Sequence, residues 1–435
     1  MAPGRPGRPT ILASPMVHQS ELAFRLQARR YDVDVASTPM LHARLLVECP
    51  SYRERELQTH AGDFPLVAQL CGHDPGEFAK AAGVLCEAGV SAIDINFGCP
   101  QAVAKRGRYG AYLLEDVPLM QRLVSALAEA THGSSIPVTC KMRCLNSREA
   151  TVDVAEALVE AGVSVLTLHG RTLVQNKQRS GSANWERIRD VCEALGATHK
   201  SGGESGVSVV ANGSVASLSD AVKLAAFTGA EGVMSAEALL ENPAMFMRDA
   251  VFQSVDDNNN DVNSDDDADR MILRANTVPL RAALFELRQS ALAHEYMDIS
   301  RALIDVHGTY LKPMRSHLFK FAHGSLRHDT TMHDIRDAFA RESSFDGLVR
   351  ATDVLGDRCW DKMRAAVRCA ESSGDVAVRA LLEDVVPLLG DGGGECRVRE
   401  HPHQVVKAVM RTLGRHFGGD TTNTVAGWYF RHARV

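Results

Sequence analysis

The sequence predicts an α/β fold, a (β/α)8 TIM barrel followed by a C-terminal helical domain. Over about the first 250 residues, short runs rich in β-branched residues alternate with stretches rich in Ala, Leu and Glu. This alternation is typical of repeated β/α units around a parallel sheet. Beyond an acidic segment near residue 260, the strand-like runs stop and helical patterns alone continue. We therefore expect two regions with different secondary structure.

Eight strand-like runs precede the acidic segment. They are Thr10–Met16, Val33–Ser37, Phe64–Leu70, Ala92–Phe97, Ile136–Met142, Val163–His169, Val207–Asn212 and Gly232–Ser235. The helical candidates between them include Pro75–Glu87, Val117–Ala130, Thr151–Glu160 and Leu218–Phe227. Eight strand–helix repeats favour a closed barrel. The alternative is an open, doubly wound sheet of six or seven strands.

The acidic segment accounts for the net charge of -6. Its seven aspartates are Asp256, Asp257, Asp261, Asp265, Asp266, Asp267 and Asp269. A segment of this composition cannot bury enough apolar surface to fold, so we predict a disordered linker over residues 254–270. The rest of the chain is about neutral. Overall charge therefore neither supports nor excludes RNA as a partner.

The linker separates the predicted domains. We expect a disordered Pro/Gly/Arg tail over residues 1–9, the barrel over 10–253, and the helical domain with a C-terminal extension over 271–435. Helical spacing in the last region predicts the helices Pro279–His294, Ile299–Leu311, Met332–Ala340 and His403–Phe417. The region Leu381–Cys396, which ends in a run of glycines, is predicted to be a flexible connection.

Composition places the chain among ordinary globular proteins, with 45% apolar and 23% charged residues. No apolar run approaches the roughly 18 residues that span a bilayer, and the first residues contain no apolar core of a secretory signal. The ten cysteines form no repeated Cys-x-x-Cys pairs that suggest zinc. We expect reduced thiols, no metal, no membrane partner and a cytoplasmic or nuclear location.

Polar residues follow the predicted strands. In a barrel, the active site is built at the C-terminal ends of the strands. Gln69, Asn96, Lys141, His169 and Asn212 all lie at such ends. A single polar residue at a strand end more often only caps the next helix. Here the polar residues follow several strands whose C-terminal ends lie on the same face of the barrel, which favours a site.

Cys99 lies on a Gly-Cys-Pro turn directly after the fourth strand-like run, and a basic, glycine-containing loop follows it. A side chain on such a turn is held toward a substrate, and the loop behind it suits an anion. The alternative interpretation is a buried structural cysteine. Glycine turns after the seventh and eighth runs, at Gly213 and near Ala236, suit a phosphate group.

The segment Asp94–Asp116 resembles the signature of the tRNA-dihydrouridine synthases, flavin enzymes that reduce uridine in tRNA. The matching residues are Asn96, Cys99, Pro100, Lys105, Arg106, Gly107, Tyr109, Gly110 and Ala111. The Lys-Arg-Gly-x-Tyr-Gly-Ala pattern is most similar to the eukaryotic branch that modifies positions sixteen and seventeen of the D-loop. The resemblance extends over roughly Thr10 to Ala322.

The resemblance implies an FMN site. The residues that it assigns to FMN are Pro15, Met16 and Val17 at the isoalloxazine ring, Gln69 and Lys141 at its polar edge, His169 at the ribityl-phosphate side, and Asn212, Gly213, Ser214, Ala236 and Glu237 at the phosphate. Many family members have an arginine where this chain has Glu237. A glutamate side chain cannot pair with phosphate, so only its backbone would serve.

The resemblance also implies the reaction. Reduced FMN, regenerated by NADPH or NADH, gives a hydride to uracil C6, and Cys99 gives a proton to C5. An unperturbed thiol is mostly protonated near neutrality, whereas the nearby cations favour thiolate. His169 is the alternative acid. The implied substrate-binding residues are Asn96, Lys105, Arg106, Arg143 and Arg171.

A uridine in folded tRNA must be extruded to reach the pocket. Two basic loops, Lys105–Gly110 and Arg171–Arg179, suit tRNA phosphates, although both also fit plain solvated loops. In the helical region, the basic and aromatic stretch His307–Lys320 suits RNA through cations and stacking.

Three alternatives stay open. A barrel flavoenzyme acting on a small molecule, similar to dihydroorotate dehydrogenase, would share the FMN site but would not need a basic helical domain. A non-catalytic RNA-binding relative would lack Cys99 or Lys141. A flavin-free phosphate-binding barrel would lack the set of Pro15, Gln69 and Lys141. The sequence does not predict the oligomeric state.

Overall fold

The computed structural model describes residues 7–175, 181–200, 207–247, 278–308, 310–372, 376–389 and 397–417. Contacts divide the chain into two compact units, with the boundary between Leu239 and Leu240. The predicted acidic linker, residues 254–270, lies outside the described residues.

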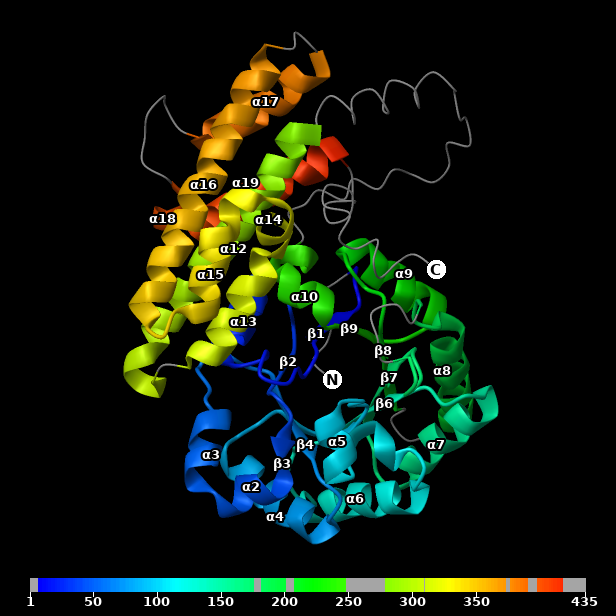
Figure 1. The fold of residues 1–435 in the computed structure, drawn as a ribbon. Helices are drawn as coiled ribbons and strands as arrows, with labels where there is room; N and C mark the ends of the chain where they lie inside the picture. Colours follow the sequence, from blue (N-terminus) through cyan, green and yellow to red (C-terminus); the bar gives the residue numbers. More distant parts are fainter. Residues whose placement is uncertain are drawn as a thin grey trace, which may run out of the picture. The chain divides into compact units, whose positions relative to one another are not determined.

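The first unit is a parallel barrel (Figure 1). Its strands are β1 (Thr10–Ala13), β2 (Ala36–Ser37), β3 (Leu41–His42), β4 (Leu66–Cys71), β5 (Ala92–Phe97), β6 (Val138–Arg143), β7 (Val165–His169), β8 (Ser208–Asn212) and β9 (Gly232–Ser235). Their order is β1-β9-β8-β7-β6-β5-β4-β2, and β3 also pairs with β4. A parallel bridge between Leu12 and Val35 joins β1 to the segment before β2 and closes the ring. The predicted barrel is confirmed, and β2 and β3 share its second position.

Helices surround the strands of this unit (Figure 1). They are α1 (Leu22–Arg29), α2 (Ala43–Glu48), α3 (Pro50–Glu56), α4 (Pro75–Glu87), α5 (Ala102–Gly107), the short η1 (Gly110–Leu113), α6 (Val117–Ala130), α7 (Arg148–Glu160), α8 (Trp185–Lys200) and α9 (Leu218–Thr228). Side chains of Asp74, Asp116, Ser147 and Ser217 accept backbone N–H groups in the first turns of α4, α6, α7 and α9. Helices α4, α6 and α9 begin at the predicted residues, whereas α7 begins at Arg148, three residues before the predicted Thr151.

An apolar layer fills the barrel below its C-terminal end. Leu12, Val35, Val210 and Met234 form one core cluster, and Val67 and Val165 pack against it. Because side chains alternate along a strand, the next inward positions lie two residues further on. Those positions include Gln69 on β4, Thr167 on β7 and Asn212 on β8. The apolar layer is therefore the floor beneath a polar barrel mouth.

The predicted disordered tail does not extend to Arg8. The Arg8 guanidinium pairs with the Asp34 carboxylate at 2.7 Å and donates to the Asp32 carbonyl at 2.9 Å, and its side chain is 2% exposed. A buried ion pair of this kind fixes the backbone on both sides of it. Residues 1–6 lie outside the described residues.

The second unit is helical where the structure describes it. Its elements are α10 (Glu237–Glu241), which spans the boundary, η2 (Pro243–Phe246), α12 (Val278–His307), α13 (Leu311–Phe321), α14 (His323–His328), η3 (Thr330–Met332), α15 (His333–Arg341), α16 (Phe345–Glu371), α17 (Val376–Leu389), α18 (Arg397–Glu400) and α19 (Pro402–Phe417). Helix α12 packs against α16 and α19. At Gly356 of α16, a Cβ atom would lie 2.5 Å from the His294 ring, so glycine permits this close crossing.

Two expectations for this unit need correction, and one helix was not predicted. Helix α12 is continuous where the sequence predicted two helices, because neither glycine nor proline lies between His294 and Ile299. Helix α16 was not predicted. Helix α17 reaches Leu389, so the flexible connection predicted from Leu381 is wrong over that part, and residues 390–396 lie outside the described residues.

Within the predicted RNA-binding stretch, His317 is fully buried on α13 and packs against Tyr296 of α12 with ring centroids 4.9 Å apart, so its ring cannot stack on a base. Tyr310 and Phe319 are only partly buried, and Lys312 on the same helix is exposed. Among the described residues, no helix is long and apolar enough to span a membrane.

Candidate active site

The turn after β5 holds Cys99 between two rigid groups. The Asn96 side-chain oxygen accepts the N–H groups of Gly98 at 3.0 Å and Cys99 at 2.9 Å. From the other side, the Ala111 N–H donates to the Cys99 carbonyl at 3.1 Å. Gly110 has a φ of +68°, and a Cβ atom there would lie 2.7 Å from that carbonyl. Only glycine fits this position, so the Tyr-Gly-Ala element clamps the turn.

The electrostatics of Cys99 favour the neutral thiol. Burial raises the pKa of this partly buried thiol above its ordinary value. A hydrogen bond from the Gln101 backbone and the charges of Arg143 and Lys141 act in the opposite direction, but burial outweighs them. The question left open by the sequence, thiol or thiolate, is therefore answered in favour of a protonated Cys99 near neutral pH.

Lys141 lies on β6 directly beside Asn96 in the sheet register. Burial and the neighbouring Arg143 charge lower the pKa of Lys141 to about 8, against the attraction of Asp94 and Cys99. The ammonium group is thus mostly charged at neutral pH and lies close enough to Cys99 to lower the pKa of the thiol, although burial outweighs this effect.

Arg143, two residues further along β6, connects two loops of the mouth. Its Nε donates to the Gly98 carbonyl at 2.7 Å, and its Nη1 donates to the Thr172 carbonyl at 3.0 Å. The guanidinium therefore ties the Cys99 turn to the loop after β7. Burial, followed by the nearby Arg171 charge, lowers the pKa of Arg143.

His169 ends β7 and pairs with Arg143 and Asn212 in the sheet register. Its Nδ1 accepts the Arg171 N–H at 3.2 Å. Burial and the charges of Lys141, Arg143 and Arg171 lower the pKa of His169 well below its ordinary value. A histidine that stays neutral among three cations is a poor proton donor, which argues against His169 as the acid.

Backbone conformation shapes the turn after β8. The Asn212 amide donates to the Met234 carbonyl at 2.8 Å and ties β8 to β9. Gly213 has a φ of +121°, and a Cβ atom there would lie 2.7 Å from the Ala183 Cβ and 3.1 Å from the His169 ring. Ser214 also has a positive φ, and its Oγ accepts the Ala183 N–H at 2.8 Å.

Ala236 and Glu237 follow β9. Ala236 is partly buried, and Glu237 is exposed at the start of α10. Burial lowers the pKa of Arg171, and the nearby Glu237 charge opposes this shift only in part. The glutamate that departs from the family pattern is therefore close to an arginine from the neighbouring loop.

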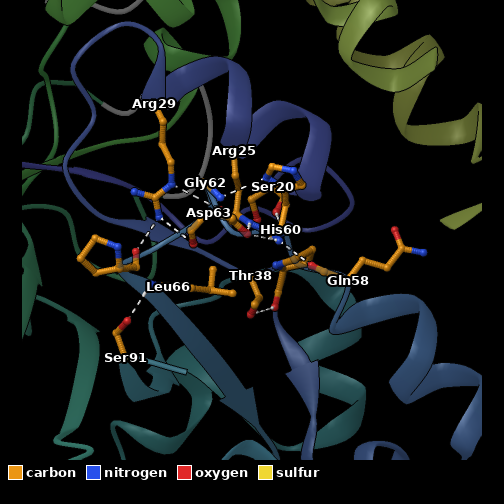
Figure 2. A network of polar contacts seen from close by, with 12 residues as sticks. Ser20, Arg25, Arg29, Thr38, Gln58, His60, Gly62, Asp63, Leu66 and Ser91 are labelled. Atoms are coloured by element: carbon orange, nitrogen blue, oxygen red, sulfur yellow. Dashed lines mark hydrogen bonds and ion pairs between the residues drawn. The ribbon is translucent and has the colours of Figure 1, made fainter. Parts of the chain in front are cut away.

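The segment Pro15–Val17 follows β1. Met16 is buried, and its N–H donates to the Ser20 hydroxyl at 3.0 Å. The Ser20 carbonyl in turn accepts a hydrogen bond from Arg25 at 2.8 Å, and Arg25 pairs with the buried Asp63 (Figure 2). A buried ion pair thus anchors the loop that carries Met16.

Lys105 and Arg106 are exposed beside the Cys99 turn. The sequence predicted a loop here, but both residues lie on helix α5, which ends at a left-handed Arg108 with a φ of +53°. Three exposed cations therefore follow one another closely on this rim. The second predicted basic loop is described only as far as Gln175, and residues 176–180 lie outside the described residues.

Sequence reasoning missed two buried residues of this mouth, Asp94 on β5 and Thr139 on β6. The Asp94 carboxylate accepts hydrogen bonds from the Gln69 amide at 2.8 Å and the Thr139 hydroxyl at 2.7 Å. The signal was present, because Asp94 and Thr139 lie two residues before Asn96 and Lys141 and therefore face the same side of the sheet.

The mouth fits an anionic cofactor. Lys141, Arg143 and Arg171 bring three cations toward it, against the buried Asp94 and the exposed Glu237. Glycine at position 213 allows the turn after β8 to pack directly against Ala183 and the His169 ring, because a Cβ there would clash with both. Within the described parts of the chain, no cluster of three or more His, Cys, Asp or Glu side chains could hold a metal ion.

A family profile described as dihydrouridine synthase (Dus) matches residues 11–282. The chain belongs to this family. The resemblance seen in the sequence is thereby confirmed. The tRNA-dihydrouridine(16/17) synthase-like protein of Rattus norvegicus is 36% identical over 357 residues, which cover 81% of this chain and 68% of that protein. The tRNA-dihydrouridine(16/17) synthase of Saccharomyces cerevisiae is 40% identical over 243 residues, which are 55% of each chain.

The human tRNA-dihydrouridine(20a/20b) synthase-like protein is 34% identical over 240 residues, which cover 55% of this chain and 71% of that protein. The chain thus spans between about half and 71% of the length of these curated relatives. Among solved structures, a complex of 2-naphthoyl-CoA reductase aligns with a TM-score of 0.42 and 8% identity, covering 55% of this chain and 49% of that chain. The fold assignment rests on the strand order and register given above.

Proposed function

We propose that this protein reduces uridine to 5,6-dihydrouridine at position 16 or 17 of tRNA, with FMN as cofactor and NADPH or NADH as reductant. Cys99 carries the proposal, because a protonated thiol on a clamped turn lies beside two buried cations at a barrel mouth. Family membership and the names of the relatives that match most of this chain supply the substrate class.

FMN is the cofactor that fits this mouth best. Lys141, Gln69 and the segment Pro15–Val17 would hold the ring, and the turn at Asn212–Ser214 with His169 and Ala236 would hold the ribityl phosphate. The backbone N–H of Glu237 would contribute there, and Arg171 would offset its negative side chain. When bound, FMN supplies the hydride that is added to uracil C6.

The remaining chemistry belongs to this chain. Cys99 donates its proton to uracil C5, so that hydride and proton together add two hydrogens across the C5–C6 bond. The raised pKa of Cys99 keeps that proton available at neutral pH. Arg143 holds the turn in place, while Lys141 stabilises negative charge as it develops on the base. Solvent then returns a proton to the thiolate.

The rim of the mouth suits tRNA. Lys105, Arg106 and Arg108 are exposed cations next to the Cys99 turn, where they would contact phosphates around an extruded uridine. On the helical unit, Lys312 of α13 is a further exposed cation that would suit a tRNA phosphate.

The test is a Cys99→Ala enzyme assayed with NADPH and unmodified tRNA, with dihydrouridine measured by mass spectrometry. We expect wild-type content of bound flavin and a loss of turnover of about 10²–10⁴-fold, the usual contribution of a general acid. Cys86→Ala, at another partly buried free cysteine, is the matched control and should retain activity. Full activity of Cys99→Ala would remove the acid role. Wild-type protein that binds flavin and oxidises NADPH but leaves tRNA unchanged would move the substrate to a small molecule or another RNA.

A further inference from the structure

A chain of three buried side chains leads from the barrel interior to the Cys99 turn. Asp94 accepts from the Gln69 Nε2 at 2.8 Å, and the Gln69 Oε1 accepts from the Asn96 Nδ2 at 2.8 Å. The Asn96 Oδ1 then accepts the N–H groups of Gly98 and Cys99. Asp94, Gln69 and Asn96 are 6%, 1% and 7% exposed, so water competes little for these contacts.

We infer that Asp94 is a positioning residue for Cys99, because its carboxylate fixes the direction of both amides and thereby the turn that carries the thiol. We call Asp94, Gln69 and Asn96 the amide relay. The role of Cys99 in the reaction rests on the proposed function, but the contacts of the relay do not.

The direction of the relay follows from hydrogen-bond chemistry. An ionised carboxylate only accepts hydrogen bonds, whereas each amide has a donor end and an acceptor end of nearly equal size. Facing Asp94, Gln69 must present its NH2 group and therefore offers its oxygen to Asn96. Asn96 then presents its own NH2 group to Gln69, which leaves its oxygen for the turn.

Reversal of the relay would disrupt the turn. If Asn96 turned its amide over, its NH2 group would face the two N–H donors of Gly98 and Cys99, and three donors would meet without an acceptor. Buried unpaired donors are costly, so the turn would have to open. Nothing within the amides themselves prevents this reversal, because both ends are similar in shape. At the turn end, the Gly98 and Cys99 N–H groups favour the observed direction, as does the Met40 Sδ, which accepts from the Asn96 Nδ2 at 3.0 Å. The Asp94 carboxylate fixes the direction at the interior end.

Asp94 keeps its charge in spite of burial. Burial raises the pKa of Asp94 to about 6, while hydrogen bonds from Gln69 and Thr139 and the charge of Lys141 lower it. The carboxylate is thus mostly ionised at neutral pH. A second donor, the Thr139 hydroxyl, contacts the other carboxylate oxygen and does not belong to the relay.

Thr139 makes a double-mutant test possible. In Asp94→Asn, the new amide has one donor end. That donor can turn toward Thr139, because a hydroxyl also accepts, and the relay then keeps its direction. In Asp94→Asn with Thr139→Val, this partner is missing. The new NH2 group then either stays unpaired beside the introduced valine or turns toward Gln69 against the direction of the relay, and in both cases the hold on the Cys99 turn is weakened. Thr139→Val alone leaves the ionised carboxylate and hence the direction unchanged.

Two readouts follow for these variants. The first readout is kcat with NADPH and tRNA. We expect Thr139→Val to change kcat less than about threefold and Asp94→Asn to lower it severalfold. The double variant should lower kcat at least about tenfold more than the product of the two single-variant effects. KM for tRNA should stay within about twofold, because the exposed cations proposed to contact tRNA phosphates, Lys105, Arg106 and Arg108, lie outside the relay. The second readout is the alkylation rate of Cys99 by iodoacetamide, measured by peptide mass spectrometry. It should rise at least about threefold in the double variant alone, because an opened turn exposes the thiol.

The inference fails if the effects of the two substitutions on kcat simply multiply and Cys99 alkylation is unchanged in the double variant. Circular dichroism and flavin content confirm that each variant is folded, and Thr139→Ala replaces Thr139→Val if the valine variant does not fold. If wild-type protein makes no dihydrouridine, the proposed function fails, yet the alkylation rates still test the relay.

Discussion

Two buried aspartates in the same barrel are held in opposite ways. Asp63, fully buried, pairs with the Arg25 guanidinium at 2.7 Å and the Arg29 guanidinium at 3.3 Å (Figure 2). Asp94 has no guanidinium among its hydrogen-bond donors in the described part of the chain, which are the amide of Gln69 and the hydroxyl of Thr139. The hydrogen-bond donors to Asp63 are charged guanidinium groups, whereas the donors to Asp94 are neutral side chains.

The difference in partners gives the two carboxylates different roles. Asp63 stabilises the fold, whereas we assign Asp94 a role in orienting the amide relay. At Asp63, two arginines also donate to the carbonyls of Ser20, Gln58 and Pro65, so one ion-pair network fixes three backbone segments. At Asp94, the neutral partners do not compensate for burial, and the pKa rises to about 6. A buried carboxylate with this pKa costs stability, and we attribute its presence to the direction that it gives to the amide relay.

The largest effect is expected from Asp63→Asn. This change leaves two buried guanidinium groups without their counter-charge, so the free energy of unfolding should fall by about 3–5 kcal/mol. Urea denaturation followed by circular dichroism measures it. Asp94→Asn is the matched control, and its unfolding free energy should change by less than about 1.5 kcal/mol because the hydrogen-bond donors of Asp94 are neutral groups that an amide oxygen can also accept. Equal losses in the two variants would abolish the contrast between the two carboxylates.

An intermediate effect is expected from pH. The unfolded chain releases the Asp94 proton near the ordinary pKa of 3.8, and the folded protein releases it only near 6. The folded state therefore binds more protons between these values, and the contribution of Asp94 to stability falls as pH rises through this window, by on the order of 3 kcal/mol in total.

The measurement is the difference in unfolding free energy between wild type and Asp94→Asn, recorded from pH 4 to pH 7. Taking the difference cancels the other titrating groups that the two proteins share. A difference that does not vary with pH, or that favours wild type as pH rises, would contradict the raised pKa of Asp94.

The smallest effect is expected from Thr139→Val. Loss of one buried hydrogen bond should lower the unfolding free energy by about 1 kcal/mol. The Thr139 hydroxyl also lowers the pKa of Asp94, so its loss should raise this pKa further. The pH range over which Asp94 lowers stability should then extend to higher pH. A window displaced downward would show that Thr139 does not stabilise the ionised carboxylate.

The barrel itself was readable from the sequence because its signals are local. The alternation of eight strand-like runs with helical stretches depends on residues within a few positions of one another. The long α16 was missed although its pattern is amphipathic, because no family motif marked it. Arg8 was assigned to a disordered tail because its partner, Asp34, lies 26 residues away.

For the candidate site, the sequence by itself determined which residues lie at the strand ends, among them Cys99, Lys141 and His169. The alternation of side chains along a strand and the residue at which the strand ends depend only on residues close in the sequence. Tertiary structure alone decided their states. It buries Cys99 enough to keep its proton, surrounds His169 with cations, and brings Gln69 and Asp94 within hydrogen-bond distance from separate strands. Burial and hydrogen-bond direction depend on atoms distant in sequence, and therefore only the closed barrel specifies them.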